Sequence, residues 1–183
     1  MNPSEDTRNL IDKYKGLSNE EIIADLDKTR IPLEIAIENL AHDFNIGTIV
    51  RNANAFNVAR VHIIGKRKYN RRGAMVTDKY LHIDHFATVD EFVDDAHARG
   101  MKIVSVDNNR PESKALSKTK LAPNSILVFG SESDGISQEL LDKSDQAFYI
   151  EQLGSTRSIN VGCASAVAMY EAVRQLGLLP KDA

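Results

Sequence analysis

The sequence contains one cysteine, no tryptophan and no long apolar run. Because Cys163 is alone, no disulfide can form within the chain, which is typical of proteins from the reducing cytoplasm. No apolar stretch approaches the roughly 20 residues that cross a bilayer. The polar, acidic beginning of the chain also lacks the apolar segment of a signal peptide. We therefore expect a cytoplasmic protein without a membrane partner.

Several common catalytic motifs are missing too. The five histidines show no zinc-ligand spacing with Cys163, so no metal site is expected. Cys163 stands among small residues of a predicted helix, which favours an inert buried thiol over a nucleophile. No strand is followed by G-x-G-x-x-G or by a phosphate-binding G-x-x-x-x-G-K-[ST], which argues against an α/β enzyme that uses a dinucleotide.

What is present is an alternation of short apolar runs with longer helical patterns, as in an α/β fold with a largely parallel sheet. The expected strands are 33–37, 60–64, 102–106, 126–129 and 147–150. The expected helices are 18–28, 47–57, 89–99, 138–143 and 161–176. We predict an N-terminal helical extension over residues 1–30, with Ser18 as a helix cap, and one domain over residues 31–183.

Amide and charged side chains crowd the junction between strand 33–37 and helix 47–57. Asn39 and Asn45 lie there, and Arg51 follows Gly47 by one helical turn on the same face. Two interpretations stand about equally. Either Asn45 caps the helix and Arg51 is a solvated surface charge, or this strand end is part of a binding site.

A basic loop occupies residues 66–72 of a chain whose net charge is −3. Such a loop can neutralise phosphates, and an aromatic side chain within it can stack on a base. The alternative is a solvated loop that only aids solubility. The residues that we expect to contact a polyanion are Lys66, Arg67, Lys68, Tyr69, Arg71 and Arg72, and the loop does not indicate which polyanion.

Two further loops follow buried strands, where parallel sheets bind ligands. In the first, Gly130 and Gly135 allow close approach of a ligand, although an ordinary turn with Ser137 as a helix cap would look the same. In the second, a polar run ends at Asn160, a good helix cap, and a helix of small residues follows. Tight packing explains the small residues, but not the polar residues just before them.

Three of these segments together resemble the motifs of the SpoU/TrmH branch of the SPOUT RNA methyltransferases, over residues 33–176. The first motif is matched by Asn45, Gly47 and Arg51. The second is matched by Gly130, Glu132, Gly135, Ile136 and Ser137, and the third by Ser158, Ile159, Asn160, Tyr170 and Glu171. Two positions depart from the family pattern: Glu151 stands where proline is usual, and Gly162 where serine is common.

The resemblance implies a fold that composition does not indicate, a parallel sheet whose C-terminal part forms a deep trefoil knot. It also implies S-adenosylmethionine as cofactor, bound in the knot, and a homodimer with the active site at the interface. The cofactor-binding residues that it implies are Val106, Asp107, Asn108, Phe129, Gly130, Ser131, Glu132, Ile150, Leu153, Ser158 and Asn160.

The reaction implied by the resemblance is methyl transfer to a ribose 2′-hydroxyl of RNA. Arg51 would bind phosphate or stabilise the developing alkoxide, since a guanidinium is a poor base at neutral pH. Asn45 and Ser158 would orient the ribose, and Glu132 would organise the site. The compact chain favours transfer RNA over ribosomal RNA. The alternatives are a ribosomal RNA methyltransferase, or a non-catalytic RNA-binding or ribosome assembly protein on the same fold.

Overall fold

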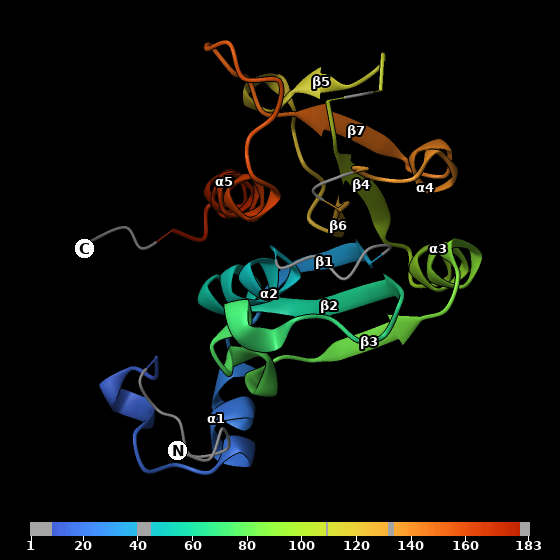
Figure 1. The fold of residues 1–183 in the computed structure, drawn as a ribbon. Coiled ribbons are helices and arrows are strands. Elements are labelled where there is room, and N and C mark those ends of the chain that lie inside the picture. Colours follow the sequence, from blue (N-terminus) through green and yellow to red (C-terminus); the bar gives the residue numbers. More distant parts are fainter. Residues whose placement is uncertain (1–8, 40–44, 109, 132–133, 180–183) are drawn as a thin grey trace.

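The computed structural model describes residues 9–39, 45–108, 110–131 and 134–179. Its centre is a seven-stranded sheet with the order β3-β2-β1-β6-β4-β7-β5, in which every pair of neighbours is parallel (Figure 1). The strands are β1 (Ile31–Asn39), β2 (Val58–Gly65), β3 (Ile83–Phe86), β4 (Lys102–Val106), β5 (Lys114–Ala115), β6 (Ser125–Phe129) and β7 (Gln146–Tyr149). The parallel α/β architecture that the sequence predicts is therefore confirmed.

Helices α2 (Asn45–Ala55) and α5 (Val161–Gln175) cover one face of the sheet, and α3 (Val89–Ala98) and α4 (Gln138–Asp142) cover the other (Figure 1). Helix α1 (Asn19–Leu26) belongs to the N-terminal segment and packs with Tyr80. Alternate residues of β1 explain the two layers, because successive side chains of a strand point to opposite faces. Leu33, Ile35 and Ile37 belong to the apolar core shared with α2 and α5. Ala36 belongs to the core shared with α3 and α4.

The five strands and five helices predicted from the sequence are all present, with ends shifted by no more than two residues. The prediction missed β3 and β5. Strand β3, of sequence IDHF, has no fully buried residue, and β5 contains only two residues. Both lie at the edges of the sheet, where little burial is needed and the apolar pattern is correspondingly weak.

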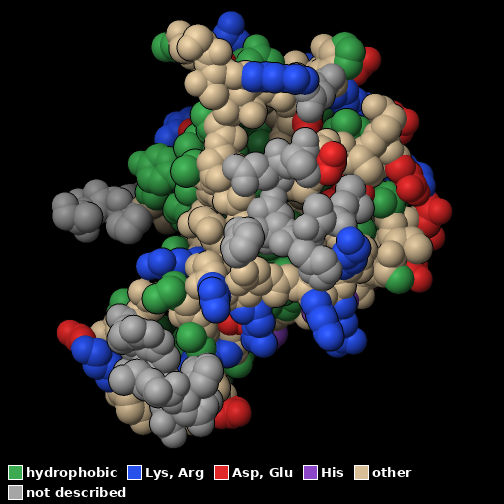
Figure 2. Space-filling model, viewed as in Figure 1, with side chains coloured by type: hydrophobic (Ala, Val, Ile, Leu, Met, Phe, Trp, Pro, Cys, Tyr) green, Lys and Arg blue, Asp and Glu red, His purple; other side chains and the backbone are tan. Residues whose placement is uncertain are grey.

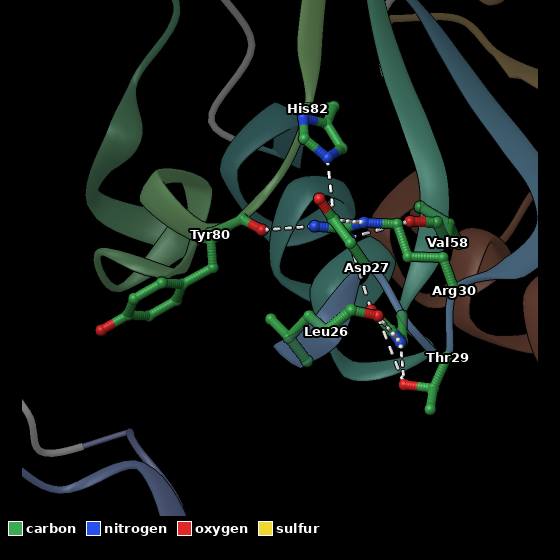
Figure 3. Close-up of polar contacts among 8 residues, drawn as sticks. Leu26, Asp27, Thr29, Arg30, Val58, Tyr80 and His82 are labelled. Atoms are coloured by element: carbon green, nitrogen blue, oxygen red, sulfur yellow. Dashed lines mark hydrogen bonds and ion pairs between the residues drawn. The ribbon is translucent and has the colours of Figure 1, made fainter. Parts of the chain in front are cut away.

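The N-terminal segment is fastened to the body by polar contacts around Arg30 (Figure 3). The Arg30 side chain is only 8% exposed, and it donates hydrogen bonds to the carbonyl oxygens of Tyr80, at 3.0 Å, and Val58, at 3.3 Å. Asp27 pairs with Arg30 at 2.6 Å and contacts His82 Nε2 at 2.9 Å. Ahead of this junction, Ser18 caps α1 as the sequence predicts. No helix among the described residues is long and apolar enough to cross a membrane.

A buried ionic cluster lies under β1 and β2, beside α3. The Glu34 carboxylate accepts a hydrogen bond from Arg99 Nη1 at 2.8 Å, and its other oxygen lies 2.7 Å from His62 Nε2. Burial by itself would raise the pKa of Glu34, but the hydrogen bonds with His62 and Arg99 outweigh burial and lower the pKa to about 2. The ionised carboxylate is therefore the form that the folded protein stabilises.

We predict that Glu34→Gln lowers the free energy of unfolding at pH 7 by on the order of 3 kcal/mol, because His62 and Arg99 lose their buried partner. The pKa of Glu34 is depressed in the folded state, so its contribution is complete above about pH 4.5 and is lost as the pH falls toward 2. Urea unfolding at pH 7 and pH 3 should therefore give a smaller difference between variant and wild type at pH 3. Glu20→Gln, at an exposed position of α1, serves as the control. An equal difference at both pH values would contradict the prediction.

Candidate functional site

A polar cavity of about 510 Å³ opens at the carboxyl ends of β4, β6 and β7, the edge at which parallel sheets bind ligands. Its walls are three of the loops that the sequence singles out. Most of the predicted cofactor-binding residues line it, namely Val106, Asp107, Asn108, Gly130, Ser131, Ile150, Ser158 and Asn160. In this text it is called the polar cavity.

Three predicted cofactor residues stand apart from the rest. The Phe129 side chain is fully buried in the core beneath the cavity, and the Leu153 side chain is fully exposed away from it. Glu132, predicted both for cofactor binding and for catalysis, lies outside the described residues. Gly135 and Ile159, which belong to the second and third motifs, also line the cavity. The lining residues that were not predicted are Asp134, Tyr149, Gln152, Arg157, Val161 and Ala164.

Sequence reasoning missed these residues although most belong to the same loops. A loop position next to a recognised motif carries no signal of its own until the chain folds around it. Gln152 is informative, because its side-chain Oε1 is buried and has no hydrogen-bond partner among the described residues. A buried acceptor that lines a cavity is ready to receive a hydrogen bond from a ligand.

Hydrogen bonds join the cavity loops to one another and to α2. Asn160 Nδ2 donates to Asn45 Oδ1 at 2.9 Å, which brings the third motif against the first. The Asn160 side chain also caps α5 by accepting from Cys163 N, as the sequence predicts. On the other side of the cavity, Asn108 Nδ2 donates to the Arg157 carbonyl oxygen at 3.0 Å. These contacts hold the second half of the loop before α5.

Helices α2 and α5 approach closely because small residues face each other. A Cβ atom on Gly162 would lie 2.8 Å from Thr48 Cγ2, which is too close without displacement. Beside it, Asn52 Nδ2 donates to the Gly162 carbonyl oxygen at 2.9 Å and to Ser165 Oγ at 3.0 Å. The small-residue part of α5 is therefore a packing surface for α2.

Helix α2 also carries Arg51, which is exposed. Its Nη2 donates to Asn9 Oδ1 at 3.3 Å, within the N-terminal segment. Neither Arg51 nor Asn45 lines the polar cavity of its own chain, although Asn45 reaches the cavity through Asn160. The predicted catalytic residues are thus split, with Ser158 in the cavity and Arg51 on the outer surface of α2.

The basic loop is held against α2 and the end of β1. Asn39 is buried at the end of β1, and its Nδ2 donates to the carbonyl oxygens of Lys66 and Lys68. A Cβ atom on Gly47 would lie 2.8 Å from Ala74 N and 2.9 Å from Gly73 Cα, so the backbones touch. Lys and Arg side chains gather over the part of the molecule where α2 and β2 lie (Figure 2). The loop is therefore a fixed cationic surface next to the first motif.

The six predicted RNA-binding residues of the basic loop differ in their exposure to solvent. Lys66, Arg67, Lys68 and Arg72 are exposed. Arg71 is exposed as well, but it forms an ion pair with the buried Asp78 carboxylate. Tyr69 is half-buried and packs against the core, and burial, followed by the nearby Asp78 charge, raises its pKa to about 12. The described geometry gives Arg71 and Tyr69 structural contacts in addition to any role with RNA.

The expectation of a buried thiol at Cys163 is wrong for this chain. Cys163 is exposed, while Gly162 and Ser165 are buried against α2. Successive helical residues point about 100° apart, so Cys163 lies on the face of α5 that turns away from α2. The described residues contain no group of three His, Cys, Asp or Glu side chains that could hold a metal ion.

Gly130 meets the strictest steric demand at the cavity. Ser131 and Gly135 exchange two backbone hydrogen bonds of 3.0 Å, which folds the second motif back on itself. A Cβ atom on Gly130 would lie 2.0 Å from the Gly135 carbonyl carbon and oxygen. Only glycine fits there.

We predict that Gly130→Ala lowers the melting temperature by several degrees, because the added methyl group must push the Gly135 backbone aside. Gly154→Ala in the loop before α5 is the matched control, since its added Cβ would meet nothing within 4 Å. Thermal unfolding followed by circular dichroism measures both variants. Equal melting temperatures for the two would contradict the steric argument.

Comparison with known proteins places this geometry in a family. A model of the SpoU rRNA Methylase family matches residues 32–170. The tRNA (guanosine(18)-2′-O)-methyltransferase of Escherichia coli (strain K12) is 30% identical over 148 residues, which cover 78% of this chain and 63% of that protein. The chain therefore spans less than two thirds of the length of that relative. The 23S rRNA (guanosine-2′-O-)-methyltransferase RlmB of Vibrio vulnificus is 27% identical over 192 residues, covering 92% of this chain and 75% of that protein.

Solved structures agree with the sequence relatives. The A. aeolicus TrmH/SpoU tRNA modifying enzyme superposes with a TM-score of 0.75 at 25% identity, covering 87% of this chain and 82% of that one. An AdoMet-bound rRNA methyltransferase from Sinorhizobium meliloti shares the fold, with a TM-score of 0.71 at 21% identity over 84% of this chain and 60% of that one. With the family match over residues 32–170, and a cavity built from the loops of the second and third motifs, the chain belongs to the SpoU rRNA Methylase family.

Proposed function

We propose that this protein transfers a methyl group from S-adenosylmethionine to a ribose 2′-hydroxyl of RNA. The observation that carries the proposal is the hydrogen bond between Asn160 and Asn45, which joins the polar cavity to the helix that bears Arg51. A cofactor pocket, a ribose-orienting group and a cationic group for the reacting oxygen are thereby brought to one region. The relatives named for 2′-O-methylation of tRNA and rRNA support the same reaction class.

The polar cavity suits S-adenosylmethionine in size and chemistry. Its volume of about 510 Å³ falls in the usual range for cofactor sites. Gly130 and Gly135 line the cavity without side chains, and the buried Gln152 oxygen is available as an acceptor. Asp107, Asp134 and Arg157 line the same space, which matches a ligand that carries both a cationic sulfonium and amine and an anionic carboxylate.

When bound, S-adenosylmethionine supplies a methyl group that its sulfonium already activates. The chain must then align the ribose hydroxyl and help to remove its proton. Alignment alone can supply up to roughly 7–11 kcal/mol in ideal cases. Asn45 and Ser158 would orient the ribose, and Arg51 would bind phosphate or stabilise the developing alkoxide, while the proton leaves through phosphate or water. Glu132, outside the described residues, would organise the site.

The proposed substrate is transfer RNA in preference to ribosomal RNA. The basic loop offers Lys66, Arg67, Lys68 and Arg72 to a phosphate backbone. Relatives of both kinds are similar to this chain, and the tRNA-modifying relatives reach the higher identity. Ribosomal RNA is the alternative. A cytoplasmic location remains a prediction from the single cysteine.

The proposed assembly is a homodimer in which Arg51 completes the site of the partner. Arg51 is exposed and does not line the cavity of its own chain. On α5, the Val167 and Tyr170 side chains are 44% and 51% exposed, and Cys163 is exposed as well. Val167 follows Cys163 by four residues and Tyr170 follows Val167 by three, so the three side chains share one side of the helix. An apolar stripe of this kind on an outer helix is a suitable contact for a second copy.

We further propose that the C-terminal part is a deep trefoil knot and that residues 1–30 are an extension to a domain of residues 31–183. The knot is supported by the way in which the segments after β5 and after β7 hold each other. Gln175 of α5 accepts from Leu121 N and donates to the Thr119 carbonyl oxygen. The capped helix α1 and the Arg30 junction support the division at residue 30.

We predict that Arg51→Ala lowers methyl transfer to RNA about a hundredfold or more, because charge stabilisation at the reacting oxygen is lost. Binding of S-adenosylmethionine should stay within about threefold of wild type, since Arg51 does not line the cavity. Incorporation of labelled methyl groups into unfractionated tRNA and calorimetry measure the two effects. Arg60→Ala, which removes a surface arginine paired with Asp84, is the control. Near-normal turnover by Arg51→Ala would remove Arg51 from the mechanism, and failure of the wild type to bind the cofactor would favour the non-catalytic alternative.

We predict that Val167→Glu shifts the protein from dimer toward monomer, because a charge would be buried in the proposed interface. Size-exclusion chromatography with light scattering measures the mass, and the melting temperature monitors folding. Leu17→Glu, at a position with the same 44% exposure in the N-terminal segment, should leave the mass unchanged. A monomeric wild type would contradict the proposed assembly.

A further inference from the structure

A second hollow, of about 250 Å³, lies beside β5 and the beginning of β7, away from the basic loop. Its lining includes four cationic residues within one short segment, Arg110, Lys114, Lys118 and Lys120. In this text it is called the lysine hollow. Lys or Arg side chains are visible over the end of the molecule where β5 lies (Figure 2).

The two acidic side chains of the lysine hollow are already engaged by other groups. Asp145 accepts from Ile103 N at 2.9 Å, and it pairs with Lys102 at 3.0 Å and His97 at 3.2 Å. Glu112 is 74% exposed and lies 3.4 Å from Arg110 Nε. Neither carboxylate forms an ion pair with the three lysines, although Lys118 lies close enough to Glu151 for its charge to contribute to the lowered pKa of Glu151.

These lysines differ from the ion-paired lysines of the chain. Lys15, Lys28 and Lys143 each form an ion pair with a carboxylate. Within the part of the chain that the structure describes, Lys114, Lys118 and Lys120 form none. Lys114, Lys118 and Lys120 together raise the local potential around one concave surface, although the whole protein has a net charge of −3.

Arg110 gives the lysine hollow a fixed wall. Its Nη1 donates to the carbonyl oxygens of Leu141, at 2.8 Å, and Ser144, at 3.4 Å, at the end of α4. Lys114 lies in β5, which pairs with Phe148 and Tyr149 of β7. The cations therefore project from segments held by the sheet and by α4.

The lysine hollow and the polar cavity are connected through β7 and through a hydrogen bond between their loops. Strand β7 begins at the lysine hollow with Gln146 and leads into the polar cavity at Ile150, roughly 13 Å farther along. Ser117, next to Lys118, donates a hydrogen bond to the Glu151 carboxylate on the loop that lines the cavity.

We propose that the lysine hollow is a second RNA-binding site, which holds backbone phosphates a few nucleotides from the ribose at the polar cavity. This inference rests on the proposed function for the identity of the polyanion. Lysine ammonium groups bind phosphate oxygens as point charges, without reading bases. The hollow thus contributes affinity and register, and the sequence preference of the enzyme arises elsewhere.

The test is the triple variant Lys114→Gln, Lys118→Gln and Lys120→Gln, with unfractionated tRNA as the probe. Filter binding over a series of salt concentrations should show an affinity about tenfold or more below wild type at low salt. The slope of log affinity against log salt should become shallower by about two to three, since each lost phosphate contact removes about one. The matched control is Lys15→Gln, Lys28→Gln and Lys143→Gln, which changes the net charge equally at paired lysines. Its slope should stay near that of wild type.

The outcomes separate this inference from the proposed function. An unchanged slope in the Lys114, Lys118 and Lys120 variant, or an equal loss in the control, overturns the inference and leaves methyl transfer by the wild type untouched. If the wild type binds tRNA without methylating it and the triple variant loses affinity, the inference stands and the proposed function falls. Calorimetry with S-adenosylmethionine and the melting temperature should match wild type, and a collapse of either would assign the lysines to folding and overturn the inference.

Discussion

The hydrogen bond from Asn160 to Asn45, with the glycine contacts beside it, is the constraint on which the candidate site depends. It joins residues separated by more than a hundred positions in the sequence. On one side, Asn160 caps α5 and shapes the end of the polar cavity. On the other, α2 packs through Gly47 against the basic loop. A wider separation of α2 from α5 would detach the cavity, Arg51 and the cationic surface from one another.

The two departures from the family pattern acquire a physical explanation in the same region. Gly162, where serine is common, leaves room for the Thr48 side chain, so the small residue and its larger neighbour compensate each other. Glu151, where proline is usual, accepts a hydrogen bond from Ser117, and this bond is the main cause of the lowered pKa of Glu151. A side-chain contact thus holds the loop that a proline would stiffen through its backbone.

The distribution of charge over the surface of this protein says more about its ligands than the net charge does. The net charge of −3 gives no hint of a polyanion, and five lysines of the described chain are paired with carboxylates. Cationic residues nevertheless gather in two places, the basic loop beside α2 and the lysine hollow beside β5. The first is visible as consecutive basic residues. In the second the cations are spaced over eleven residues of ordinary appearance and converge only after β5 has paired with β7.

The sequence by itself determined the element order, most of the helix caps and the loops that build the polar cavity, because periodicity, capping residues and strand-end motifs are local properties. It also indicated Asn45, Ser158 and Asn160 as members of one site. The edge strands β3 and β5, the exposure of Cys163, and Gln152 and Arg157 in the cavity wall were decided by the tertiary structure. So was the position of Arg51, outside the cavity of its own chain. These features depend on which face of an element meets a distant segment, and that is fixed only when parallel strands and the α2–α5 contact bring those segments together.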